Sequence, residues 1–197
     1  MTEDYLNEIK DYNTRIAWPK PSKSALLVID MQEYFLQMAS SIIGNVLALI
    51  DFCRSKGIKI IYTRHGHKNP DDGAMLLYWW GEVIQYGTLK WNLIKAVNPL
   101  DTEPIIDKSR YSAFMGTPLE EILKYRKIED LMITGVMTNC CCETTAREAF
   151  MRDYRVFFIS DATATLNDDL HIASLKNLSF AFAHVVDTNE LCRHLLD

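Results

Sequence analysis

The sequence contains no hydrophobic run long enough to cross a membrane. Its longest apolar stretches, such as LMITGVM at 131–137, are far shorter than the roughly 20 residues that a spanning helix needs. The N-terminal segment MTEDYLNEIKDYN is polar and acidic, and it lacks the apolar centre of a signal peptide. These absences predict a cytoplasmic protein with no membrane partner.

Cysteine is scarce, and its arrangement excludes two common uses. The chain has five cysteines, three of them adjacent at 140–142, and no C-x-x-C pair that would suggest a zinc site. An odd number of cysteines without a secretion signal argues against a disulfide framework, and adjacent cysteines bridge poorly. We therefore expect free thiols in a reducing compartment.

Neither sign of charge is concentrated in one region. The 21 basic and 26 acidic residues are interspersed and give a net charge of -5, so the sequence does not predict a nucleic-acid partner. Hydrophobic residues make up 48% and charged residues 24%, which is ordinary for a globular enzyme and too apolar for disorder. We expect a single domain over residues 1–197, with 1–20 as an N-terminal extension.

Apolar segments of strand length alternate with segments of helical length. The strand-like segments are SALLVID (24–30), IKIIYTR (58–64), PIIDK (104–108), DLMITGV (130–136), RVFFISDAT (155–163) and AHVVDT (183–188). Continuous apolar runs are typical of parallel strands that are buried on both faces. The pattern predicts an α/β protein with a doubly wound sheet of about six parallel strands and helices on both faces, a Rossmann-like three-layer sandwich. The segment 65–92, rich in Gly, Trp and Tyr, is predicted to be a functional loop or lid.

Reactive side chains follow several of these strand-like segments. Asp30 follows ALLVI, Lys108 ends PIIDK, and the cysteine triplet comes soon after DLMITGV. His65 and His67 follow IKIIYTR in the same way. Ligands of such sheets bind beyond the carboxyl ends of the strands, so an acid, a base and a thiol at that edge predict a catalytic site.

The three adjacent cysteines fall in the first turn of a predicted helix. Free amides and the helix dipole favour a thiolate there. Successive helical residues point about 100° apart, so the three thiols cannot share one environment. Cys142 lies on an apolar stripe with Ala146 and Ala149 and is predicted to be a core residue. Periodicity does not choose between Cys140 and Cys141, and all three can also be read as small buried hydrophobes.

Three segments resemble the isochorismatase-like cysteine hydrolases: ALLVIDMQEYF (25–35), IIDKSRYSAFMGTPLEEIL (105–123) and ITGVMTNCCCETTAREAFMRDYRVFFISDATAT (133–165). They occur in the order and spacing of that family. The family pattern G-V-x-T-x-x-C-V-E-x-T-A-R places the nucleophile six residues after the glycine, which from Gly135 is Cys141. The resemblance also implies that Asp30 is the general base and that Lys108 is the cation of a catalytic triad.

The same resemblance implies how the site works. A cis peptide between Val136 and Met137 and an oxyanion hole built from the amides of Met137 and Cys141 are expected. The Cys141 thiolate, its pKa lowered by Lys108, would attack an amide carbonyl. Asp30 would protonate the departing amine and then activate water for hydrolysis of the thioester.

The subgroup is indicated by further segments. Members that cleave isochorismate have lost the nucleophilic cysteine, so its presence favours hydrolysis of a C–N bond. YTRHGHKNPDDGAMLLYWWGEVI (62–84) and SDATATLNDDLH (160–171) look most like nicotinamidases of the plant type. We therefore expect a cysteine amidohydrolase that converts nicotinamide to nicotinate and ammonia. The alternatives are an isochorismatase, an amidase acting on ureidoacrylate or an N-carbamoyl amine, and a non-catalytic binding protein on the same fold.

The resemblance is weakest at the metal site of the microbial nicotinamidases. Those enzymes bind zinc through D-x-H and a further histidine, whereas the aligned positions here are His65 and His67, with Asp71 or Asp72 as the only other candidates. We expect catalysis to require no cofactor, although a His-x-His pair can ligate a divalent metal. The two histidines can equally be loop residues that bind substrate or each other.

Aromatic residues near these positions are candidates for the rest of the pocket. Phe35 lies beside the Asp30 loop, and Trp79 and Trp80 can stack on a planar ring or form an interface. Together with the two histidines they are our predicted substrate-binding residues, and the partner is a small-molecule amide. The apolar segment 75–91 also predicts a homo-oligomer.

Overall fold

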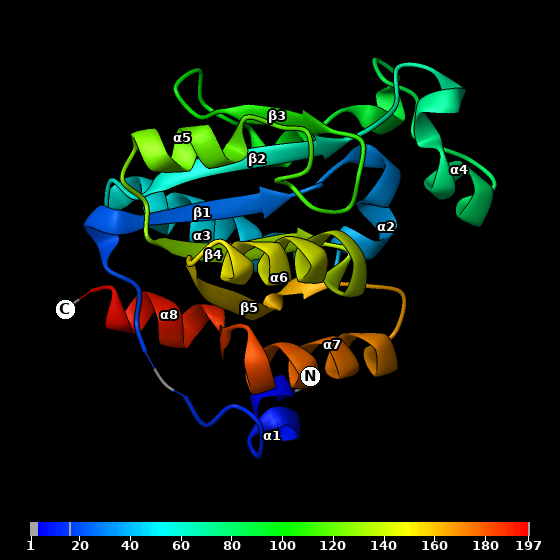
Figure 1. Ribbon diagram of the computed structural model, residues 1–197. Coiled ribbons are helices and arrows are strands. Elements are labelled where there is room, and N and C mark those ends of the chain that lie inside the picture. The colour runs from blue at the N-terminus through cyan, green and yellow to red at the C-terminus, as the bar shows by residue number, and fades with distance from the viewer. Residues whose placement is uncertain (1–3, 16, 197) are drawn as a thin grey trace.

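A six-stranded parallel sheet forms the centre of the molecule (Figure 1). This computed structural model describes residues 4–15 and 17–196. Neighbouring strands are all paired in parallel, in the order β3-β2-β1-β4-β5-β6. The strands are Ser24–Ile29 (β1), Lys59–His65 (β2), Ile105–Lys108 (β3), Asp130–Val136 (β4), Arg155–Ala164 (β5) and His184–Val186 (β6). The predicted parallel sheet is confirmed.

Helices cover both faces of this sheet. The helices of the chain are Tyr5–Ile9 (α1), Leu36–Ala39 (α2), Ile43–Ser55 (α3), Met75–Trp80 (α4), Leu119–Tyr125 (α5), Glu143–Met151 (α6), Asp168–Ala181 (α7) and Thr188–His194 (α8). Helix α4 lies away from the sheet and covers neither face (Figure 1). One core cluster contains buried side chains of α1, α5, α6 and α7, and the other contains those of α2, α3 and α8. The doubly wound, three-layer arrangement is therefore confirmed.

The central strands show why continuous apolar runs predicted this fold. Every residue of β1 and of β4 is buried. Successive side chains of a strand point to opposite faces, so Leu27 packs into one core cluster and Leu26 into the other. Burying each such side chain contributes roughly 1.5–3 kcal/mol, which makes these two strands the best-anchored part of the sheet.

The strand order places a switch point between β1 and β4. The chain moves from β1 outward through β2 to β3, and then returns to build β4, β5 and β6 on the other side. Loops that leave the carboxyl ends of β1 and β4 therefore diverge and leave room for a ligand. With strands about 4.8 Å apart, β3 lies roughly 10 Å from β1, a gap that only a long side chain can bridge.

Two features differ from a simple alternation of strands and helices. Part of the predicted N-terminal extension belongs to the packed body: α1 contributes Ile9 to the core, and Arg15 donates a hydrogen bond to the carbonyl of Phe180 in α7 at 2.8 Å. The segment 65–92, predicted as a loop or lid, contains the short helix α4 and a bridge between His67 and Gln85. In the described part of the chain no single helix is long and apolar enough to span a membrane, although a pair bent by 105°, Glu33–Ala39 with Ile43–Ser55, has the required combined length and composition.

Candidate active site

Asp30, Lys108 and Cys141 meet at the carboxyl edge of the sheet. The Lys108 ammonium lies 2.7 Å from Asp30 Oδ2 and 3.3 Å from Cys141 Sγ. It also donates to the carbonyl of Arg110 at 3.0 Å, so its three donors each have a partner. Because the lysine comes from β3 and the aspartate from the end of β1, the long lysine side chain spans the width of β2 to make this contact.

A threonine on β2 fixes the orientation of Asp30. Thr63 donates to Asp30 Oδ1 at 2.6 Å, and its hydroxyl oxygen accepts from the Asp30 amide at 3.2 Å. Asp30 has a φ of 49°, a left-handed conformation that aspartate tolerates better than most residues. Sequence reasoning missed Thr63, because only the pairing of β1 with β2 brings the two residues together.

Cys141 lies in a π-helical turn rather than in the first turn of an α-helix. The turn spans Thr138–Cys142, and the carbonyl of Met137 accepts hydrogen bonds from the amides of Cys140 and Cys142, both at 3.1 Å. Helix α6 begins only after this turn, at residue 143. The predicted helix is therefore wound more widely where it carries the cysteines, which changes the direction of each thiol.

The backbone before this turn has two unusual conformations. The peptide bond between Val136 and Met137 is cis, which confirms the arrangement implied by the family resemblance. Gly135 has a φ of 117°, and a Cβ there would lie 2.0 Å from the carbonyl oxygen of Ile29 on β1. Glycine is required for this close approach, which brings the cysteine turn beside Asp30.

A buried histidine supports the same turn from behind. His171 Nδ1 lies 2.9 Å from the hydroxyl oxygen of Thr138, and His171 Nε2 lies 3.1 Å from the carbonyl oxygen of Ser160. A carbonyl only accepts, so Nε2 carries the proton and Nδ1 accepts from the threonine. His171 sits inside the helical pattern of α7, and nothing in its spacing indicated a contact with the cysteine turn.

The three cysteines occupy three environments. Cys142 is fully buried, which confirms its prediction as a core residue, whereas Cys141 is 6% exposed and Cys140 is half-buried. Burial raises the pKa of the Cys141 thiol well above its usual range; Lys108 opposes this shift and Asp30 adds to it. Lys108 therefore acts in the expected direction and lowers the pKa of this thiol, but burial outweighs the nearby ammonium and the net shift is upward.

The charge of Lys108 is maintained despite its burial. Burial alone would lower the pKa of the ammonium, but Asp30 and then Cys141 raise it above its ordinary value. At neutral pH the site therefore holds a lysine cation against the carboxylate and a protonated thiol.

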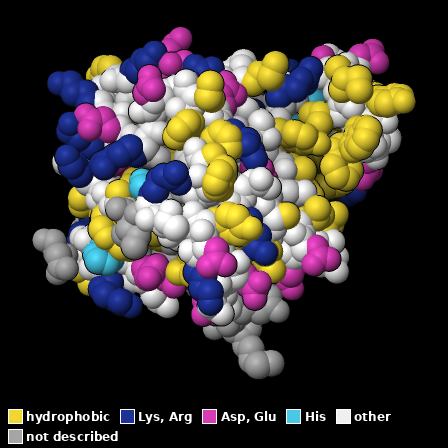
Figure 2. Space-filling model, turned by 60° about the horizontal axis from the view of Figure 1, so that its bottom comes forward, with side chains coloured by type: hydrophobic (Ala, Val, Ile, Leu, Met, Phe, Trp, Pro, Cys, Tyr) yellow, Lys and Arg dark blue, Asp and Glu magenta, His cyan; other side chains and the backbone are white. Residues whose placement is uncertain are grey.

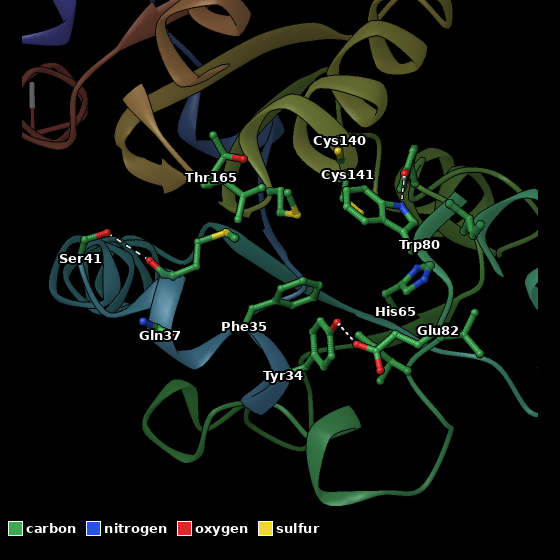
Figure 3. A pocket seen from close by; sticks show the side chains of 17 residues that line it. Tyr34, Phe35, Gln37, Ser41, His65, Trp80, Glu82, Cys140, Cys141 and Thr165 are labelled. Atoms are coloured by element: carbon green, nitrogen blue, oxygen red, sulfur yellow. Dashed lines mark hydrogen bonds between the residues drawn. The ribbon is translucent and has the colours of Figure 1, made fainter. Parts of the chain in front are cut away.

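A cavity of about 770 Å³ opens onto Cys141 (Figure 3). Phe35, His65 and Trp80 line it, as predicted. Sequence reasoning missed several other residues of its wall, namely Tyr34, Met38, Leu76, Glu82, Tyr111, Cys140 and Leu166. Tyr34 adjoins the predicted Phe35 and Tyr111 lies within the second family motif, so proximity to a motif was the only signal available.

Two predicted substrate-binding residues do not line the cavity. Trp79 is 72% exposed, because neighbouring residues on α4 point about 100° apart and only Trp80 turns inward. The indole of Trp80 donates to the Tyr111 hydroxyl at 2.7 Å, which ties α4 to the loop after β3. His67 is 1% exposed and lies behind His65. The assignment of Trp79 and His67 to the pocket is therefore corrected.

The two histidines face each other across a short gap. Their Nε2 atoms are 3.3 Å apart. Burial, and then the charge of Lys108, lowers the pKa of His65 to about 4; burial, and then Arg110, lowers that of His67. Both rings are thus neutral at pH 7, and one donates to the other. Among the described residues no group of three or more His, Cys, Asp or Glu side chains could hold a metal ion, so two nitrogens alone do not fit a resident zinc.

The chain is similar in sequence and in fold to known hydrolases. A family model described as the isochorismatase domain matches residues 24–190. Nicotinamidase 3 of Arabidopsis thaliana is 47% identical over 190 residues, which are 95% of this chain and 96% of that protein. Enterobactin synthase component B of Escherichia coli (strain K12) is 36% identical over 186 residues, 90% of this chain and 65% of that protein. A solved structure of a cysteine hydrolase from Pseudomonas syringae pv. phaseolicola 1448A has a TM-score of 0.88 at 26% identity, covering 92% of this chain and 96% of that one.

Proposed function

This chain belongs to the isochorismatase family, and we propose that its substrate is an uncharged aromatic carboxamide, nicotinamide, which it converts to nicotinate and ammonia. It is a hydrolase of amide C–N bonds. The observation that carries the proposal is the contact of Lys108 with both Asp30 and Cys141 at the wall of an aromatic cavity. Similarity to a plant nicotinamidase over nearly the whole chain supports the choice of amide.

Acylation begins from a protonated thiol. Because burial raises the pKa of Cys141, the proton leaves for Asp30 as the sulfur attacks the carbonyl carbon. Lys108, 3.3 Å from the sulfur, stabilises the negative charge that forms there. The amides of Met137 and Cys141 are the proposed donors to the oxyanion, which concentrates stabilisation in the transition state.

The proton on Asp30 then completes the first half of the reaction. It passes to the amide nitrogen as the C–N bond breaks, ammonia leaves and a thioester with Cys141 remains. Asp30, again a carboxylate, takes a proton from a water molecule that attacks the thioester. The carboxylic acid product departs and the thiol is restored. Every catalytic group in these reaction steps is a side chain or backbone amide of the protein, so we propose that acylation requires no metal.

The wall of the cavity favours an uncharged ring over the alternative substrates. Much of it is aromatic or apolar, with Phe35, Trp80 and Met38 among the lining residues. Isochorismate and ureidoacrylate carry carboxylates, which proteins usually bind through arginine or lysine. Among the described residues that line the cavity none is a lysine or arginine, and Lys108 is already paired with Asp30. An isochorismatase or ureidoacrylate hydrolase is therefore less well supported.

The test is release of ammonia from a panel of amides. Nicotinamide, pyrazinamide, ureidoacrylate and N-carbamoyl amines are compared by kcat/KM, with cleavage of isochorismate followed in parallel. The Cys141→Ala variant serves as the blank for each. We expect nicotinamide and pyrazinamide to be the best substrates. A higher kcat/KM for ureidoacrylate, or cleavage of isochorismate that survives in Cys141→Ala, would replace this assignment.

Assembly and compartment are part of the same proposal. Hydrophobic side chains gather on the side of the molecule that carries α4 (Figure 2), where Met75, Tyr78 and Trp79 are each more than two-thirds exposed. We propose that this surface forms a homo-oligomer interface. Sedimentation showing only a 22.7 kDa species at micromolar concentration would contradict it. Five free cysteines fit a reducing compartment, and we propose that the enzyme acts in the cytoplasm.

A further inference from the structure

The wall of the cavity is almost without charge. Among the described residues that line it, Glu82 has the one carboxylate side chain and none is a lysine or arginine. His65 also lines the cavity, but its pKa is lowered to about 4 by burial and by Lys108, so it is neutral at pH 7. Lys108 contacts the sulfur of Cys141 and forms a salt bridge with Asp30. The electrostatic preference of the wall therefore depends on one carboxylate.

Tyr34 holds this carboxylate in place. The Tyr34 hydroxyl donates to Glu82 Oε1 at 2.8 Å, and the Tyr34 ring packs edge-on against Phe35 with ring centres 4.9 Å apart. Burial, and then Glu82, raises the pKa of the Tyr34 hydroxyl, so it stays a donor at neutral pH. Figure 3 shows the pair on the opposite side of the cavity from Cys141. Glu82 thus acts on the part of a substrate that is remote from its carboxamide.

One further charge lies near this pair. The Lys90 ammonium is 5.5 Å from the centre of the Tyr34 ring, but Lys90 does not line the cavity. The lining itself combines aromatic rings with a carboxylate that accepts a hydrogen bond from Tyr34 and forms no salt bridge within the described part of the chain, an environment that attracts organic cations and repels anions.

We propose that Glu82 is a specificity-determining residue that makes the cavity select against anions and accept cations. The inference rests on the proposed amidase function and names its substrate class: neutral and positively charged heteroaromatic carboxamides, including N-alkylated pyridinium carboxamides. Carboxylated amides are disfavoured. The carboxylate product of the reaction is disfavoured for the same reason, which promotes its release.

The size of the effect follows from the partial exposure of Glu82. A full charge on the ligand several ångströms from a carboxylate that is open to solvent changes binding by about three- to tenfold, because water screens the interaction. The cation gains and the anion loses, so the preference for cation over anion shifts by about ten- to a hundredfold when the carboxylate is removed. High salt weakens this preference.

The experiment compares three amides of similar shape: nicotinamide, its cationic N-methylpyridinium analogue and its anionic 5-carboxy derivative. We measure kcat/KM for each, and inhibition by nicotinate, in wild type, Glu82→Gln, Glu82→Lys and Asp51→Asn. The last variant makes the same change of net charge as Glu82→Gln at an exposed position of α3 that does not line the cavity. A fifth variant, Tyr34→Phe, removes the hydrogen bond and keeps the charge.

We expect Glu82→Gln to reduce the cation-to-anion ratio, mainly through KM, and to make nicotinate a stronger inhibitor. Glu82→Lys should reverse the ratio, Tyr34→Phe should change it less than Glu82→Gln, and Asp51→Asn should leave it unchanged. An unaltered ratio in both Glu82 variants overturns the inference, as does an equal change in Asp51→Asn. If wild type releases no ammonia from any amide, the proposed function fails separately. Calorimetric binding of the same three ligands to wild type and Glu82→Gln then still decides the charge preference.

Discussion

The ammonium nitrogen of Lys108, whose side chain is fully buried, lies 3.3 Å from the sulfur of Cys141. It is simultaneously 2.7 Å from the carboxylate of Asp30. In the proposed mechanism one cation therefore stabilises the negative charge of the site, whether that charge is on the carboxylate before attack or on the sulfur during it. The proton can move between acid and thiol without creating an unpaired buried charge.

Replacement of Lys108 by methionine tests this arrangement. The variant keeps the length of the side chain but leaves Asp30 as a buried, unpaired carboxylate. We expect the free energy of unfolding to fall by about 3–5 kcal/mol, and kcat to fall by at least about a hundredfold where the protein still folds. Lys108→Arg, which retains a cation, is the matched control. A Lys108→Met variant with wild-type stability and turnover would show that the ion pair has no such role.

The reactivity of Cys141 towards iodoacetamide should be low at neutral pH. Burial raises the pKa of this thiol, and Asp30 raises it further, so the thiolate needed for alkylation forms only in alkaline solution. In Asp30→Asn the curve of labelling rate against pH should move to lower pH. Mass spectrometry of the peptide that contains Cys141, in a Cys140→Ala background, measures the labelling of this thiol. Complete labelling of wild type below pH 7 would mean that the thiol is already ionised at that pH.

Substitution of each member of the cysteine triplet separates chemistry from packing. Cys141→Ala removes the proposed nucleophile and should reduce amide hydrolysis by many orders of magnitude. Cys142→Ala deletes only a buried sulfur and should lower stability by about 1–2 kcal/mol with most of the activity kept. Cys140→Ala, at the cavity wall, should also keep most of the activity. Circular dichroism checks the fold of each variant first. Wild-type turnover in a folded Cys141→Ala protein would show that Cys140 or Cys142 is the nucleophile.

Removal of metal should leave acylation intact. The proposed nucleophile, proton carrier and cation are side chains of the protein, and the facing nitrogens of His65 and His67 do not by themselves complete a metal site. After exhaustive chelation, with metal content measured in the same sample, we expect the burst of ammonia in a single turnover to persist. Loss of that burst after chelation would show that an ion takes part, if zinc restores the burst in wild type and fails to restore it in His65→Ala.

Much of the fold could be predicted because it depends on local pattern. The continuous apolar segments around Leu27 and Ile133 are buried on both faces of the sheet. Such burial requires apolar residues at every position, and this pattern is visible in the sequence. Asp30, Lys108 and Cys141 were found because each follows a strand and belongs to a family motif.

The remaining features depend on contacts that sequence spacing does not encode. Thr63 supports Asp30 only because two strands pair in a particular register. Trp79 and Trp80 are adjacent in a helix of six residues, too short for periodicity to show which one faces the cavity. The π-helical turn at Cys141 arises because the carbonyl of Met137 accepts two amides, a local choice that composition does not indicate.

His171 provides the last prediction, through its hydrogen bonds to Thr138 at 2.9 Å and to Ser160 at 3.1 Å. Burial lowers the pKa of His171 to about 4 from its ordinary value of 6.5. Between these values the unfolded chain takes up a proton that the folded chain does not, so stability is complete above pH 6.5 and declines as the pH falls towards 4. The pKa values of His65 and His67 are lowered as well, so His171→Asn should remove only part of this decline, up to roughly 3 kcal/mol. It should also lower kcat about tenfold with little change in KM, because the turn carrying the nucleophile loses its support. Thr138→Val, which keeps the imidazole, should lower kcat but retain the decline in stability as the pH falls from 6.5 towards 4. Unchanged kcat in both folded variants would show that this contact does not position the nucleophile.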